Sequence, residues 1–166
     1  MKGQFTIDYI MSLIIFIIFV IYLILQVTQI VPAYLYEVTN QRLKSEVFQI
    51  SEILVNDPGE PIGWSMSQLP VRVGLSDQTQ NKTNLVSRNK ILDLQTICTN
   101  GYDSVKTKLA IENQIAIYVN ITDGTELLKC KPPSPPSNLV KVSIKRVVAI
   151  NNPPGTVGIL YLEMWG

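Results

Sequence analysis

An uninterrupted apolar run near the start of the chain constrains the fold more than any other feature. No charged residue lies between Asp8 and Glu37. A helix over Tyr9–Val31 would extend roughly 35 Å at about 1.5 Å per residue, which is enough to cross a hydrocarbon core of about 30 Å. The sequence therefore predicts a transmembrane helix over residues 4–31, with membrane lipid as its first partner.

This run differs from a cleaved secretory signal, which has a basic front, an apolar core of about 7 to 15 residues and a small-residue cleavage site behind it. Here the polar front is only Met1, Lys2 and Gly3, the apolar run is longer, and no such cleavage site follows Val31. Any processing is therefore expected in front of the run.

The segment Lys2-Gly3-Gln4, followed by Asp8 and the apolar run, resembles the class III signal peptide of archaeal type IV pilin-like proteins. The resemblance implies a leader over residues 1–3, which a prepilin peptidase in the membrane removes by cutting between Gly3 and Gln4. It also implies that the mature helix is an anchor and the site of assembly with identical or related pilin subunits.

Asp8 would then be close to the new N-terminus, where many type IV pilins carry a Glu that pairs with the terminal amine of a neighbouring subunit. An ionised carboxylate at mid-membrane costs on the order of 2.5–3.5 kcal/mol on insertion scales, so an amine partner is favoured once assembly buries the acid. The resemblance thus assigns Asp8 to assembly. The alternative is that Asp8 lies among the headgroups and caps the helix N-terminus.

Length and charge outside the helix indicate one extracytoplasmic domain over residues 56–166, large enough for a single hydrophobic core. The chain has 14 Lys and Arg against 13 Asp and Glu, a balance that does not favour nucleic acid as a partner. Lys2 precedes the span, so the positive-inside rule predicts a single-pass protein with a cytoplasmic N-terminus and a head outside the cell.

The chain has two cysteines, Cys98 and Cys130. An even number in an extracytoplasmic domain favours a disulfide that closes a loop of roughly 33 residues. Two buried, reduced thiols are the alternative. Neither a C-x-x-C spacing nor a histidine is present to complete a zinc site, so no metal or cofactor is expected.

After the span, Pro32 either kinks a continuing helix or ends it. A stripe of apolar residues at helical spacing comes next, which indicates that an amphipathic helix continues over residues 32–55. Its apolar side needs a cover, as in the type IV pilin helix that packs against a globular head. The stripe consists of Leu43, Val47, Ile50 and Leu54.

The helix is expected to stop at Asn56-Asp57-Pro58-Gly59, which combines turn-forming residues with a proline. This segment and the next residues resemble a helix-exit signature of archaeal pilin-like surface proteins, Pro-Gly-x-Pro-x-x-Trp and then a short strand ending Gly-Leu, here within Leu69–Asp77. Trp64 could belong to a binding site, but packing of its indole over the helix exit is the favoured interpretation. The matching residues are Pro58, Gly59, Pro61, Trp64, Gly74 and Leu75.

The remainder predicts an α+β fold, in which the distal half of the long hydrophobic helix packs against a small antiparallel sheet of about four strands with short helices beside it. Asp123-Gly124 marks a hairpin, and Trp165 closes the last strand. The expected helices are Ser87–Ile97, capped by Ser87, and Tyr102–Leu109; the expected strands are Ile115–Ile121, Glu126–Cys130, Val140–Ile150 and Thr156–Trp165.

Two sequons predict N-glycosylation if the head lies outside the cytoplasm. One is at Asn81 in a polar loop, and the other is at Asn120 on the solvent side of a half-buried strand. Sequons also arise by chance, so the alternative that neither site is used stays open.

Catalysis is not expected from this composition. The chain has no histidine, which excludes Ser-His-Asp and Cys-His arrangements and histidine ligation of a metal. Asp123 and Glu126 could act on a glycoside or bind calcium, but at hairpin spacing they indicate a turn and a nearby surface charge.

The sequence is therefore interpreted as that of a peptidase-processed, type IV pilin-like subunit of an archaeal cell-surface filament. The alternative is a single-span surface protein, such as a receptor or complex component, that keeps its helix as a permanent anchor and does not polymerise. A surface enzyme is the third and least supported class.

Overall fold

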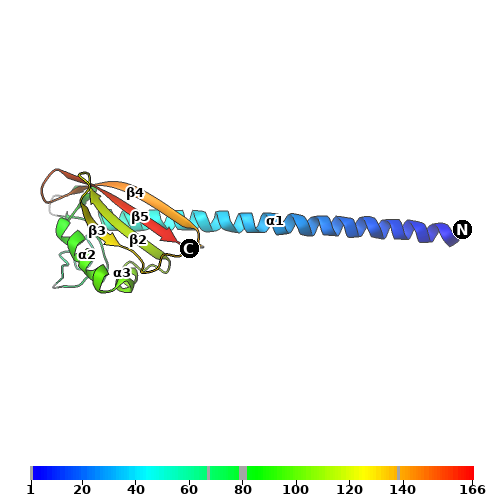
Figure 1. Cartoon of the computed structure of the whole chain (residues 1–166), viewed down its shortest axis with the longest axis horizontal. Helices are drawn as coiled ribbons and strands as arrows, with labels where there is room; N and C mark the ends of the chain where they lie inside the picture. Colours follow the sequence, from blue (N-terminus) through cyan, green and yellow to red (C-terminus); the bar gives the residue numbers. More distant parts are fainter. Residues whose placement is uncertain (1, 67, 79–81, 138) are drawn as a thin grey trace. The chain divides into compact units, whose positions relative to one another are not determined.

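The chain divides into two compact units, Met1–Thr39 and Asn40–Gly166, and the second is here called the head. Helix α1 (Lys2–Asn56) supplies the first unit and the start of the head (Figure 1). The fold is α+β, as predicted, with short helices and one sheet in the head. The computed structural model describes residues 2–66, 68–78, 82–137 and 139–166, with side chains described from Ile7 onward.

Helix α1 continues through Pro32, which confirms that the proline does not end it. Proline lacks an N–H, so the carbonyl four residues before it loses its intrahelical donor. The neighbouring turns nonetheless remain helical up to Asn56, one residue beyond the predicted end. There the N–H of Asp57 bonds the carbonyl of Ile53 at 2.9 Å, and Pro58 is the next residue.

The part of α1 that belongs to the head buries one side in the hydrophobic core. Polar contacts hold the same part at its edges: Arg146 donates to the Glu52 carboxylate at 2.5 Å, and the Asn113 amide donates to the Glu46 carboxylate at 2.9 Å. The predicted stripe is confirmed, because its four members are all buried in one cluster with strand residues. They are Leu43, Val47, Ile50 and Leu54.

The head contains one five-stranded sheet. The strand at one edge pairs in parallel with its neighbour, whereas the other pairs are antiparallel. The prediction of about four antiparallel strands missed this edge strand, because two residues carry no alternation to detect. The strands, in spatial order, are β1 (Leu85–Val86), β4 (Lys141–Ile150), β5 (Thr156–Trp165), β2 (Gln114–Ile121) and β3 (Glu126–Cys130).

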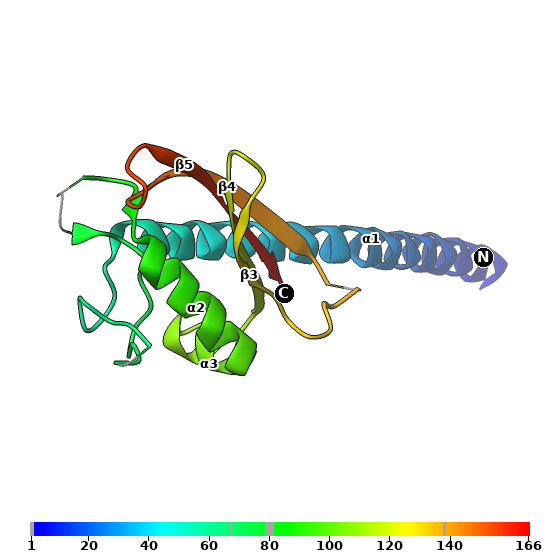
Figure 2. The ribbon, with the colours of Figure 1, turned by 60° about the vertical axis from the view of Figure 1, so that its left-hand side comes forward.

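The sheet buries its inner face and exposes its outer face. On β2 the inward-facing Ile115, Ile117 and Val119 are buried, whereas Asn120 is exposed, as the alternation predicted. Ala116 also faces outward by alternation, yet it is buried beside its β5 partner Glu163. Figure 2 shows α2 (Arg88–Asn100) beside β3, and α3 (Tyr102–Lys108) contacts α2.

The two short helices were predicted nearly where they lie, and the predicted N-cap residue of the first is correct, although its side chain does not cap the helix. Ser87 occupies the N-cap position of α2 without a side-chain cap hydrogen bond. Instead, the Asn151 side-chain oxygen accepts the N–H of Arg88 at 2.9 Å. A residue from the turn before β5 therefore satisfies the start of α2, which local sequence cannot reveal.

The short strand predicted within Leu69–Asp77 is wrong, because this segment forms only isolated bridges. Its backbone groups satisfy the end of α1 instead. The N–H of Leu75 bonds the carbonyl of Leu54 at 2.8 Å, and the N–H of Ser76 bonds the carbonyl of Asp57 at 3.1 Å. The last carbonyls of a helix need such external donors, and this loop provides them.

Candidate functional site

The first candidate site is the apolar surface of α1 between Ile7 and Val38. Large apolar side chains project on every side of this helix, with exposed fractions from 45% at Leu13 to 70% at Tyr9. The helix is long and apolar enough to cross a membrane by length and composition, which is consistent with a single-pass membrane protein. A surface of this kind requires lipid or other apolar helices around it.

The predicted processing and assembly residues lie within two turns of each other at the start of α1. Gly3 and Gln4 are helical, and the Asp8 side chain is exposed. Gln4 and Asp8 are four residues apart and therefore share one face of the helix. Because α1 begins at Lys2, Asp8 lies in the second turn of this helix and not at its N-cap. Its pairing in an assembly and the alternative of a location among the headgroups both stay predictions.

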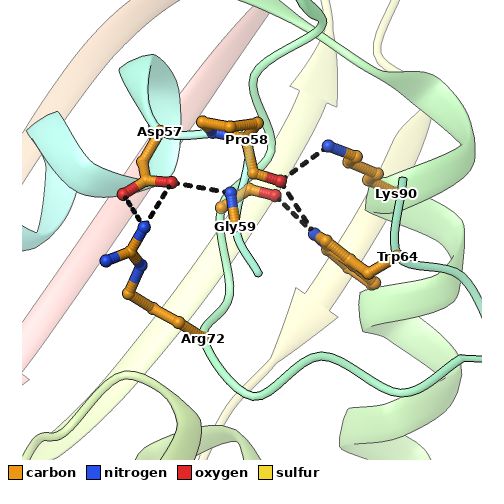
Figure 3. A network of polar contacts seen from close by, with 7 residues as sticks. Asp57, Pro58, Gly59, Trp64, Arg72 and Lys90 are labelled. Atoms are coloured by element: carbon orange, nitrogen blue, oxygen red, sulfur yellow. Dashed lines mark hydrogen bonds and ion pairs between the residues drawn. The ribbon is translucent and has the colours of Figure 1, made fainter. Parts of the chain in front are cut away.

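The second candidate site is the helix-exit cluster, formed by Asp57, Pro58, Gly59, Trp64, Arg72 and Lys90 (Figure 3), together with Gly74, whose carbonyl accepts from Trp64. Trp64 is buried at its centre, and its indole Nε1 donates to the carbonyls of Pro58 at 3.1 Å and Gly74 at 2.9 Å. The preferred interpretation of Trp64 is thereby confirmed, because its indole packs over the helix exit and its polar atom is used internally.

Both glycines of the helix-exit cluster lie where a side chain would not fit. Gly59 has φ +77°, and a Cβ there would lie 2.7 Å from the Trp64 indole nitrogen. A Cβ on Gly74 would lie 2.2 Å from the carbonyl oxygen of Asp57. The glycines of the Pro-Gly-x-Pro-x-x-Trp and Gly-Leu pattern thus allow the loop to close over the helix end.

An ion pair between Asp57 and Arg72 joins the two ends of the loop that follows α1. The Asp57 carboxylate accepts the N–H of Gly59 at 2.7 Å and pairs with the Arg72 guanidinium at 2.9 Å. The Glu60 N–H also bonds the carbonyl of Arg72 at 2.9 Å. These contacts fix the chain immediately after α1, since both sides of the loop are bonded to the same turn.

Lys90 completes the helix-exit cluster, and sequence reasoning missed it. Its buried ammonium donates to the carbonyls of Pro58 at 2.7 Å, Ile62 at 2.8 Å and Ser76 at 3.1 Å. Burial lowers the pKa of Lys90 below its ordinary value, and nearby carboxylates partly oppose this. All three N–H donors are used, so Lys90 serves structure rather than binding.

Cys98 and Cys130 form a disulfide, which confirms the prediction and removes the alternative of two free thiols. Cys98 lies in α2 and Cys130 ends β3, with 5.7 Å between their Cα atoms. The bond therefore joins α2 to β3, which is the edge strand of the sheet opposite β1.

Tyr102 is a second residue that sequence reasoning missed. Its buried hydroxyl donates to the carbonyl of Ile115 at 2.8 Å and accepts the Ile115 N–H at 2.9 Å. Burial raises the pKa of this phenol above its ordinary value. The pair ties the start of α3 to β2, and no spacing rule connects the two positions.

Of the two predicted glycosylation sites, Asn120 lies in the described part of the chain and Asn81 lies outside the described residues. Asn120 is exposed on β2, and Thr122, the third residue of its sequon, is exposed just after that strand. The structure therefore exposes the side chains of Asn120 and Thr122, whereas Ile121 between them is partly buried and packs against the core.

The carboxylates considered for catalysis serve the hairpin instead. Asp123 accepts the N–H of Thr125 at 2.8 Å, a bond that lowers the pKa of Asp123, and Glu126 pairs with Lys129 at 3.4 Å. Within the part of the chain that the structure describes, no group of three or more acidic or cysteine side chains could hold a metal ion.

Comparison of the chain with known protein families, with curated proteins and with solved structures gave no match. The interpretation of the two candidate sites therefore depends on their own chemistry. The helix-exit cluster is internally satisfied, whereas the apolar surface of α1 requires something outside the chain.

Proposed function

We propose that this chain is a type IV pilin-like structural subunit, which assembles into an archaeal cell-surface filament through its N-terminal hydrophobic helix after residues 1–3 are removed. The observation that carries this proposal is the apolar surface of α1, exposed on every side and interrupted near its start by the single acid Asp8. A membrane anchor requires only the apolar surface, whereas assembly also explains the acid, because Asp8 would pair with the amine of a neighbouring subunit.

Assembly through this helix is physically reasonable because lipid tails and neighbouring apolar helices are similar environments. Moving α1 from one to the other changes little hydrophobic free energy, so packing and polar pairing decide the outcome. The branched and aromatic side chains between Ile7 and Val31 supply packing surface on all sides. A helix that is apolar all round can contact several neighbours at once.

Processing would supply the partner for Asp8. Hydrolysis of the peptide bond between Gly3 and Gln4 by a prepilin peptidase frees an α-amine at Gln4, on the same helical face as Asp8. In a filament core the carboxylate of one subunit is then neutralised by the amine of a neighbour. An unpaired buried carboxylate is strongly unfavourable, so the pair selects the correct stagger of adjacent helices.

The head would supply the outer surface of the filament. The buried stripe and the helix-exit cluster hold the end of α1 in the core of the head, and the disulfide joins α2 to β3 within the same domain.

Replacement of Asp8 tests the proposal. We expect Asp8→Ala and Asp8→Asn to reduce the yield of sheared surface filaments at least about tenfold, because the amine of the neighbour loses its partner. Asp8→Glu should retain filaments. The matched control is Glu112→Ala, which removes an exposed acid from the head and should change nothing.

Filament yield is measured by electron microscopy and immunoblotting, with the amount of chain in the membrane as the reference. Unchanged yield for Asp8→Ala would remove the pairing role. Absence of the wild-type chain from every filament would instead favour the alternative of a permanent single-span anchor.

A further inference from the structure

The outer face of the sheet carries an apolar row directly beside the Asn120 sequon. Val147 on β4 is paired with Ile159 on β5, and Ile159 is paired with Asn120 on β2. Side chains of directly paired residues project from the same face with their Cβ atoms about 4.5 to 5.5 Å apart. The Asn120 side chain therefore lies next to Ile159 in a row that begins with two aliphatic side chains and continues to Glu126 on β3.

These aliphatic side chains are uncovered in the isolated chain. The exposed fractions are 68% for Val147 and 39% for Ile159, and Val157 beside them is 42% exposed. β-Branched residues at these positions suit a strand, but threonine would suit it equally and would be better solvated. Strand formation alone therefore does not explain why these exposed positions carry apolar side chains.

In the next row of the same face, the side chains cover one another. Tyr161 and Tyr118 stack with their ring centroids 5.8 Å apart, and the Lys145 ammonium lies 5.4 Å from the Tyr161 ring centroid. Lys129 is paired with Tyr118 at the other end. In the described part of the chain Val147 and Ile159 are exposed without such ring contacts, and their neighbour in the row, Asn120, is the acceptor residue of a sequon.

We infer that Asn120 carries an N-linked oligosaccharide and that this oligosaccharide covers Val147, Val157 and Ile159. The inference depends on the outward orientation of the head, which the proposed function shares with the permanent-anchor alternative. Sugar rings have apolar C–H faces and N-acetyl methyl groups, which can exclude water from aliphatic side chains while the hydroxyls remain solvated.

The Asn120 side chain is exposed, as the transfer reaction requires. The Asn120 amide nitrogen forms a bond to the anomeric carbon of a lipid-linked oligosaccharide phosphate, the bond from that carbon to the phosphate oxygen breaks, and the phosphate leaves with the lipid while one amide proton is lost to a base. Thr122 has an exposed side chain, and its N–H is bonded to the Val157 carbonyl at 3.1 Å. Both sequon side chains are therefore held at the rim of the apolar row.

Mass analysis of the full chain from its native membrane tests the modification. Cleavage after Lys108 and Lys129 gives one peptide that contains Asn120 and no other sequon. We expect this peptide to carry an added oligosaccharide mass on Asn120. A peptide that is entirely unmodified at Asn120 would overturn the inference.

Hydroxyl-radical footprinting of the same membrane-embedded chain tests the covering. In Asn120→Gln and Thr122→Ala, which both destroy the sequon, oxidation at Val147 and Ile159 should rise several-fold over the wild type. Thr122→Ser keeps the sequon and should keep the protection. Val71, which is exposed elsewhere on the head, is the internal control and should be oxidised equally in all four chains.

Equal oxidation of Val147 and Ile159 in the wild type and in Asn120→Gln would overturn the covering role, and would leave a docked protein as the remaining way to cover the row. Failure of this inference is distinguishable from failure of the proposed function. An unmodified Asn120 in a chain that begins at Gln4 contradicts only the glycan, whereas a modified Asn120 in a chain that begins at Met1 contradicts only the processing.

Discussion

The two parts of α1 use the same residue types in opposite environments. Leu25, in the first unit, is 56% exposed, whereas Leu54, in the head, is 0% exposed. The difference lies in the pattern. Between Asp8 and Glu37 apolar residues occupy every side, and no single surface can cover them; in the head they form a stripe, which the chain's own sheet covers.

Polar contacts show the same contrast. In the apolar part of α1 the Gln26 amide reaches Tyr22 and the Thr28 hydroxyl reaches the carbonyl of Leu25, both within about one turn. In the head, by contrast, Arg146 reaches Glu52 across 94 positions of sequence. The head is thus stabilised by its own long-range contacts, whereas the apolar part of α1 depends on what surrounds it.

A matched pair of leucine truncations should give the largest difference between the two parts. Leu54→Ala removes a fully buried side chain and should lower the free energy of unfolding of the head by about 2–5 kcal/mol. Leu25→Ala should leave it unchanged. Both tryptophans, Trp64 and Trp165, lie in the head, so tryptophan fluorescence during urea unfolding of the full chain in micelles reports on the head. Equal effects of the two substitutions would contradict the division.

Removal of the disulfide should also affect the head alone. Replacing Cys98 and Cys130 together with Ser opens a loop whose closure is worth about 3–4 kcal/mol in the chain-entropy description. The same fluorescence measurement checks the loss. Insertion of α1 into membranes should be unaffected, and reduced insertion would mean that the apolar part depends on the head.

A smaller effect should separate the two tryptophans. Trp64→Phe leaves the carbonyl of Gly74 without its indole donor, and should lower the free energy of unfolding by about 1–3 kcal/mol. In the described residues the Trp165 indole makes no hydrogen bond, so Trp165→Phe should have a smaller effect. Unfolding is followed through the tryptophan that remains in each variant. An equal loss would argue against the helix-exit cluster as the source of the stability.

The sequence predicted those features of the fold that depend on local periodicity. The apolar run, the buried stripe of α1, the alternation of β2 and the long strands β4 and β5 all have repeating patterns, and the structure contains them. It did not predict β1, which is too short to show a period, or the role of Asn151 at the start of α2, which depends on a contact across 63 positions.

The candidate sites divide in the same way. Trp64 and the two glycines of the helix-exit cluster belong to one local pattern and were identified from it. Lys90 and Arg72 were not, because an isolated basic residue gives no signal of the carbonyls or the carboxylate that folding brings to it. Asp8 could be singled out from the sequence because an ionised acid beside a membrane-spanning run is costly to bury, and its role in assembly stays a prediction.

The mature N-terminus tests the assembly proposal most directly. Intact mass and N-terminal peptide analysis of the chain from its native membrane should show a protein that begins at Gln4, with Asp8 four residues behind a free α-amine. A chain that retains Met1, Lys2 and Gly3 would have no such amine at Gln4 and would contradict assembly by this route.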